Sequence, residues 1–111
     1  MAHTTPKVMN NRLYLPDCTE PVCPVESPAW FDWLHEARCF RYYSQQRHNV
    51  IRGYGPVFAP ISLRKEKRRR GCLWYAYRRS YRVLYKRYVG KTEALTRDRL
   101  EEIARTLNEV D

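Results

Sequence analysis

The sequence concentrates its basic residues in one stretch, residues 64–91, and basic residues at this density bind polyanions. The stretch contains twelve Lys or Arg and one acid, Glu66, so its formal charge is twelve minus one, or +11, whereas the whole chain of 111 residues carries +9. A surface that neutralises phosphates releases condensed counterions, and a local positive field is therefore typical of nucleic-acid binding. The candidate contact residues are Arg64, Lys65, Lys67, Arg68, Arg69, Arg70, Arg78, Arg79, Arg82, Lys86, Arg87 and Lys91.

A second group, of three cysteines and one histidine that could bind a metal, has spacing close to that of zinc ligands. It consists of Cys18, Cys23, His35 and Cys39, in the pattern C-x4-C-x11-H-x3-C. Thiolates and imidazole are a suitable tetrahedral set for Zn²⁺. Pro21 interrupts the first cysteine pair, however, and the last two residues share a helix face only if a helix continues that far. We therefore favour no metal and no cofactor, with reduced cysteines and with Cys72 buried in a strand, and structural zinc as the alternative.

Groups that could perform catalysis are sparse. None of the histidines, His3, His35 and His48, has a carboxylate or nucleophile at a recognisable spacing, and the Gly-Tyr-Gly at residues 53–55 lacks the patterns of phosphate-binding loops. The expectation is a protein without catalysis. A small basic ribonuclease is the enzymatic alternative, because such enzymes can use Arg, Lys, Tyr or His without a strong motif.

The basic stretch is predicted to lie on a three-stranded antiparallel meander. Strands are expected at residues 60–67, 72–79 and 82–89, which are rich in residues that suit a pleated surface, with a longer connection at residues 68–71 and a tight one at residues 80–81. Alternation along the middle strand predicts two sets of side chains on opposite faces, and either set could be the covered one. The sets are Trp74, Ala76 and Arg78, and Leu73, Tyr75, Tyr77 and Arg79.

A helix over residues 97–108 is predicted to cover this sheet. Thr96 is a good N-cap, Leu95 and Leu100 stand at the positions of a hydrophobic staple, and Asp98 places a carboxylate in the first turn. The apolar positions form one stripe, namely Leu100, Ile103, Ala104 and Leu107. Such a stripe is wide enough to pack on a sheet.

The N-terminal part divides into an arm and the start of the domain. Residues 1–26 are rich in proline and are expected to form an extended arm, disordered up to about Asn11, with residues 12–15 as an edge strand or anchoring peptide. A helix is predicted over residues 27–37, with Ser27 as N-cap and two core tryptophans, followed by a short strand at residues 40–43. Residues 27–111 are then a single basic α+β domain.

A polar and glycine-rich segment, residues 44–59, separates this strand from the meander. Some of its side chains have suitable geometry for base edges or phosphates, namely Gln45, Gln46, Arg47, His48, Asn49 and Arg52. An ordinary solvated loop is the other interpretation.

Three sequence strings carry a resemblance to known proteins. GCLWYAYRR at residues 71–79, KRYVGKTEALT at 86–96 and RLEEIA at 99–104 resemble a small bacterial module that occurs alone or at the ends of LuxR-type regulators. Three basic strands followed by one helix are also similar to the arm-type DNA-binding domain of tyrosine-recombinase integrases, whose exposed sheet face enters the major groove. The resemblance covers about residues 27–107, implies DNA binding without catalysis and transfers no functional residue.

These patterns favour a non-catalytic protein that binds double-stranded DNA, either sequence-specifically or with little sequence preference. Its expected role is accessory or regulatory, with a role in a mobile element as one form of it. The alternatives are an RNA-binding or ribonucleoprotein-associated protein and an interaction subunit of a larger acidic or nucleoprotein complex. Arg78 and Arg87 are the expected readers of base edges, and Arg82 and Lys86 the expected phosphate contacts. Exposed tyrosines would favour RNA over duplex DNA.

The expected location is cytoplasmic, with no membrane partner, since no apolar run has the length of a signal peptide or membrane span.

Overall fold

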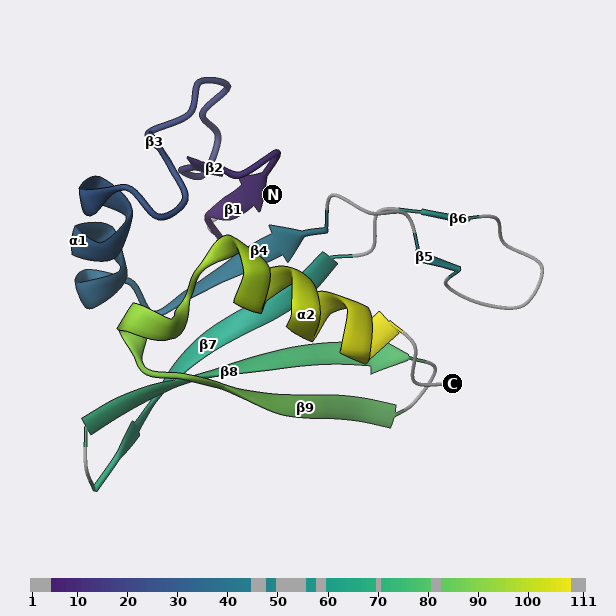
Figure 1. Ribbon diagram of the computed structural model, residues 1–111. Helices are drawn as coiled ribbons and strands as arrows, with labels where there is room; N and C mark the ends of the chain where they lie inside the picture. The colour runs from purple at the N-terminus through teal and green to yellow at the C-terminus, as the bar shows by residue number, and fades with distance from the viewer. Residues whose placement is uncertain are drawn as a thin grey trace.

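The computed structural model describes residues 5–44, 48–49, 56–57, 60–69, 71–80 and 83–108. These residues form an α+β structure in which a seven-stranded mixed sheet carries two α-helices on one face (Figure 1). The strands in spatial order are β3 (Cys23–Pro24), β2 (Arg12–Tyr14), β1 (Lys7–Met9), β4 (Cys39–Tyr43), β7 (Pro60–Arg68), β8 (Gly71–Ser80) and β9 (Val83–Gly90). A separate pair consists of β5 (His48–Asn49) and β6 (Pro56–Val57). The predicted α+β class is confirmed, whereas the prediction of a three-stranded sheet is wrong.

The predicted antiparallel meander is present as β7, β8 and β9, at one end of the larger sheet. β7 and β8 are slightly longer than expected, and β9 begins and ends one residue later than expected. Arg68 pairs with Gly71, so Arg68 lies in β7 and not in the connection that was predicted at residues 68–71. Gly71 has φ +114°, a backbone conformation that glycine adopts at low cost.

Helix α1 (Pro28–Glu36) begins as its sequence predicts. The Ser27 side chain accepts a 3.2 Å hydrogen bond from the backbone N–H of Trp30, and proline occupies the first turn. The indole N–H of Trp30 donates a 2.9 Å hydrogen bond to the carbonyl of Leu95, and its ring meets Phe40 edge to face. Of the two predicted core tryptophans, Trp30 is fully buried, whereas Trp33 is partly buried and packs against the core.

Helix α2 (Arg97–Asn108) also has the predicted bounds. The Thr96 hydroxyl accepts a 3.3 Å hydrogen bond from the backbone N–H of Arg99, and Leu95 and Leu100 are both fully buried. The apolar stripe packs across β7, β8 and β9. A short 3₁₀ turn, η1 (Thr92–Ala94), connects β9 to this helix. No helix within the described residues is long and apolar enough to cross a bilayer.

The N-terminal segment differs most from its prediction. Residues 7–24 contribute β1, β2 and β3 to the same sheet, so the expected disorder up to Asn11 is wrong for the described part of the segment. β1 pairs parallel with β4, with Lys7 opposite Arg41, and antiparallel with β2. Val8 and Leu13 are fully buried and anchor the two strands. Proline does not prevent this pairing, because Pro16 and Pro21 lie between strands and Pro24 lies on an edge strand.

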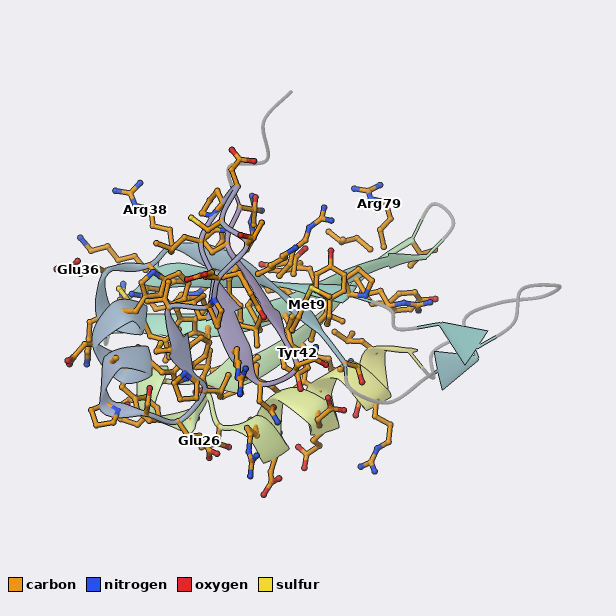
Figure 2. All side chains as sticks on the ribbon, turned by 90° about the horizontal axis from the view of Figure 1, so that it is seen from above. Met9, Glu26, Glu36, Arg38, Tyr42 and Arg79 are labelled. Carbon is orange, nitrogen blue, oxygen red and sulfur yellow. The ribbon has the colours of Figure 1, made fainter. Side chains whose placement is uncertain are left out.

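The two faces of the sheet differ in what lies against them. Trp74, Ala76 and Arg78 of β8 are buried beneath the helices, and we call this side the covered face. Figure 2 shows α2 on one side of the sheet, Arg79 pointing away from it, and Tyr42 between the sheet and the helix. The predicted alternation in β8 is thereby confirmed, and the Trp74 set is the covered one.

Candidate nucleic-acid interface

The side of the sheet opposite α1 and α2, here called the open face, gathers cations and tyrosines from six strands. Side chains alternate between faces along a strand, and directly paired residues share a face. The register therefore assigns to the open face Lys7, Met9, Arg12, Tyr14, Cys39, Arg41, Tyr43, Ser62, Arg64, Glu66, Arg68, Leu73, Tyr75, Tyr77, Arg79, Leu84, Lys86 and Tyr88. Seven of these described residues are Lys or Arg, and one is an acid.

One row of paired residues crosses the open face from β1 to β9. Its members are Lys7, Arg41, Ser62, Tyr77 and Lys86, each directly opposite the next in register. Neighbouring strands lie about 4.8 Å apart, so the row spans about 19 Å. A chain of phosphates that crosses the strands along this row would meet cations at both ends.

Several cations of the open face lie over tyrosine rings. The ammonium nitrogen of Lys86 is 4.4 Å from the ring centroid of Tyr75 and 5.5 Å from that of Tyr77. The guanidinium carbon of Arg68 is 5.2 Å from the Tyr75 centroid, and that of Arg64 is 5.9 Å from the Tyr77 centroid. Cation–π contacts of this kind hold flexible side chains in place. The tyrosines thus act as a platform that positions the charges.

Glu66 connects three residues of this face. Its carboxylate accepts hydrogen bonds from the Tyr77 hydroxyl and, at 2.7 Å, from Arg68, and lies 3.2 Å from the Lys86 ammonium. The hydrogen bond from Tyr77, followed by Lys86 and Arg68, holds the pKa of the Glu66 carboxyl below its usual value. Hydrogen bonds to Tyr77 and to Glu66 raise the pKa of Lys86. Tyr77 and Glu66 thus both favour the charged form of Lys86, while Glu66 neutralises part of the field of the face.

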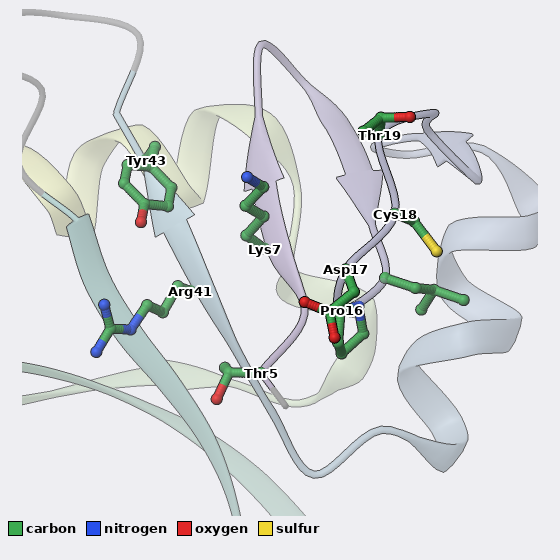
Figure 3. Close-up of a pocket in the computed structure, with 9 residues that line it drawn as sticks. Thr5, Lys7, Pro16, Asp17, Cys18, Thr19, Arg41 and Tyr43 are labelled. Carbon is green, nitrogen blue, oxygen red and sulfur yellow. The ribbon is translucent and has the colours of Figure 1, made fainter. Parts of the chain in front are cut away.

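The open face contains adjoining hollows. The larger, of about 520 Å³, lies around Ser62 and is lined by Arg41, Arg64, Tyr77 and Arg79, among others. A second, of about 380 Å³, has Lys7, Arg41 and Tyr43 along one side and Pro16, Asp17 and Cys18 along the other (Figure 3). The two hollows meet at Thr5 and Arg41, which line both. The two hollows are therefore neighbours on the open face.

The residues expected to bind nucleic acid are distributed over both faces. Arg64, Arg68, Arg79 and Lys86 lie on the open face. Four others are exposed but are not assigned to the open face. Lys67 and Arg87 belong to the covered face, Arg69 lies at the turn after β7, and Lys91 follows β9. Arg70, Arg82 and Tyr81 lie outside the described residues, as do Gln45, Gln46, Arg47 and Arg52. His48 and Asn49 form β5.

Two of the expected contact residues stabilise helices instead. Arg78 is only 6% exposed, and its Nη1 donates a 2.9 Å hydrogen bond to the carbonyl of Leu107, so the prediction that it reads base edges is wrong. The ammonium of Lys65 donates to the carbonyls of Leu34 at 2.6 Å and His35 at 2.9 Å. Both bonds satisfy carbonyls near a helix C-terminus, where a cation is favourable. Arg87, the other expected reader, pairs with Ala76 and also faces away from the open face.

Three cations of the open face were not among the expected contacts. Lys7, Arg12 and Arg41 reach it because β1, β2 and β4 extend the sheet beyond the meander. The alternation in residues 12–14 and 39–43, with apolar Leu13, Phe40 and Tyr42 on the covered face, was the available signal. Strands were predicted at residues 40–43 and, as one alternative, at residues 12–15, but their pairing into the sheet of the meander was not, so the three cations were not placed beside it.

The cysteines and the histidine of the zinc-like pattern do not come together. Across the described residues, which include all four, no cluster of three His, Cys, Asp or Glu has the geometry to hold a metal ion. Helix α1 ends at Glu36, so His35 and Cys39 do not share a helix face. The prediction that Cys72 is buried is wrong: it pairs with Lys67 beyond the end of β9 and is exposed.

The chain matches no protein-family model, no curated protein and no solved structure. Functional inference therefore depends on the geometry of the open face.

Proposed function

We propose that the protein is a non-catalytic nucleic-acid-binding protein that contacts phosphates through the open face. The observation that carries this proposal is the set of seven cations on one face, four of which lie over tyrosine rings, with Glu66 as the one acid among the described strand positions of the face. Cations held in place by rings lose little side-chain entropy when they meet phosphates. A surface of this kind is typical of proteins that bind phosphate backbones.

Single-stranded nucleic acid, RNA or DNA, is the form that the face accommodates best. The cations extend from Arg12 on β2 to Lys86 on β9, five strand spacings or about 24 Å, which is twice the width of about 12 Å of the DNA major groove. Such a face cannot enter the groove as a whole. The exposure of its tyrosines also favours a single strand, because Tyr75 and Tyr77 are only half-buried and Tyr88 is 50% exposed. Exposed rings among cations are typical of proteins that bind single strands.

Duplex DNA is a second candidate, and the end of the β7–β8 hairpin favours it. β9 ends opposite Trp74, whereas β7 and β8 continue through the pairs Lys67–Cys72 and Arg68–Gly71. A two-stranded ribbon fits the major groove, and the cations of this tip would lie against phosphates. The resemblance to arm-type domains also implies duplex binding.

Titrations of labelled single-stranded and duplex oligonucleotides across a salt series test the proposal. The logarithm of the affinity should fall linearly with the logarithm of salt concentration, because bound phosphates release counterions. Tighter binding of the single strand would identify single-stranded nucleic acid as the ligand, and tighter binding of the duplex would identify duplex DNA. Binding that does not depend on salt would contradict the proposal and favour an interaction subunit.

A further inference from the structure

The hollow at Ser62 exists because one small residue interrupts a row of large ones. Ser62 stands between Arg41 and Tyr77 in the row that crosses the open face. Arg64 lies two positions along the same strand, and all four residues line the hollow of about 520 Å³. This volume falls within the range of about 300–1,000 Å³ that is common for small-molecule sites. The hollow is thus large enough for one planar ring system with attached polar groups.

The lining combines two kinds of chemistry. Arg41, Arg64 and Arg79 come from β4, β7 and β8, and none of the three forms an ion pair with another described residue. Their guanidinium groups therefore remain available to an incoming anion. Leu84 and Tyr77 also line the hollow, and Leu84 is 52% exposed, which is unusual for a large apolar side chain. An apolar wall beside several guanidinium groups suits a ligand that carries both a flat ring and a phosphate.

We propose that this hollow is the subsite for one unpaired nucleotide of a single strand. The base packs against Leu84 and Tyr77 or stacks on the planar guanidinium of Arg64, and the flanking phosphates bind Arg41 and Arg79. A base within a duplex is stacked and paired, so it cannot enter. The inference rests on the proposed function, because it names which part of a bound nucleic acid the open face takes up.

Titration of the full chain with three labelled oligomers tests the subsite. The oligomers are a base-bearing single strand of about twelve nucleotides, an abasic strand with the same number of phosphates, and a duplex of equal length. Wild-type protein should bind the base-bearing strand about tenfold more tightly than the abasic strand, because base stacking adds to the phosphate contacts. Ser62→Phe fills the hollow with a residue that suits a strand, and it should abolish this preference. Ser62→Ala leaves the hollow open and should retain the preference.

The outcomes separate the subsite from the function on which it rests. Wild-type protein that binds both single strands equally, or Ser62→Phe that keeps the preference, would overturn the subsite and leave phosphate binding by the face intact. The wild-type comparison decides the question even where Ser62→Phe does not fold. Wild-type protein that binds none of the oligomers at low salt would overturn both the subsite and the proposed function. Parallel titrations with RNA and DNA strands identify which sugar the bound strand carries.

Discussion

Arg78 in β8 and Leu107 in α2 are joined by a 2.9 Å hydrogen bond from the guanidinium Nη1 to the backbone carbonyl. Both residues are buried, and the carbonyl belongs to the last turn of the helix. The bond connects the end of α2 to the middle strand of the meander. Arg78 therefore satisfies a helix terminus, whereas its neighbour Arg79 projects from the open face.

Replacing Arg78 should impair folding, and replacing Arg79 should impair binding. Arg78→Ala removes a buried hydrogen bond from a charged donor and should lower the free energy of unfolding by about 2 kcal/mol, measured by urea denaturation. Arg79→Ala should change it by less than about 0.5 kcal/mol, because the side chain is exposed, while it weakens nucleic-acid binding. An Arg78→Ala protein of wild-type stability that had lost binding would show that Arg78 contacts the ligand.

Arg41 should contribute to binding although it lies outside the basic stretch. On a single strand, loss of one phosphate contact reduces the slope of log affinity against log salt by about 0.7, so Arg41→Ala should show this change with unaltered thermal stability. The matched control is Arg105→Ala, which removes an exposed arginine from α2 on the other side of the sheet. Equal slopes for both variants would contradict a role for β4 in the interface.

Glu66 should weaken the binding that its neighbours provide. Glu66→Gln removes the negative charge beside Arg68 and Lys86, so the affinity for single strands should rise by about threefold in a direct titration. Glu102→Gln makes the same change of charge on the exposed surface of α2 and serves as the control. A similar rise in both variants would mean that only net charge matters.

The same carboxylate should make stability depend on acidic pH. The pKa of Glu66 is lower in the folded protein than in the unfolded chain, where it is about 4.3. Its contribution to stability is therefore complete above the unfolded value and is lost as the pH falls through the folded value. Urea unfolding at a series of pH values should show a steeper loss below about pH 4.3 for the wild type than for Glu66→Gln. Identical pH profiles would show that the contacts of Glu66 do not form in solution.

Local signals predicted the two helices and the meander. Ser27, Pro28 and Thr96 set the beginnings of both helices through capping, which depends only on residues within one turn. Alternation in β8 likewise separated Trp74 from Tyr75 correctly. The sequence alone could not indicate which face of the sheet α2 covers, because Arg78 interrupts the otherwise apolar set of side chains on one face of β8.

Pairing between distant segments accounts for what the sequence did not predict. β1 and β2 have only three residues each, and β1 is held by a parallel partner more than thirty residues away, with Lys7 opposite Arg41. Such short strands carry little periodic signal, and prolines around them suggested an arm. For this reason three cations of the open face, Lys7, Arg12 and Arg41, were not predicted from the sequence. The width of the face became evident only from the assembled sheet.

Two charge-reversal variants of equal net charge test most directly whether the open face is the binding surface. One carries Arg41→Glu, Arg64→Glu and Arg79→Glu, and the other carries Arg87→Glu, Lys91→Glu and Arg105→Glu, none of which is among the residues assigned to that face. Each lowers the formal net charge from +9 to +3, since three reversals remove two units each. In single-strand titrations at moderate salt, the first should bind at least about a hundredfold more weakly than the wild type, and the second less than about fivefold. Equal losses in the two variants would contradict the assignment of binding to the open face.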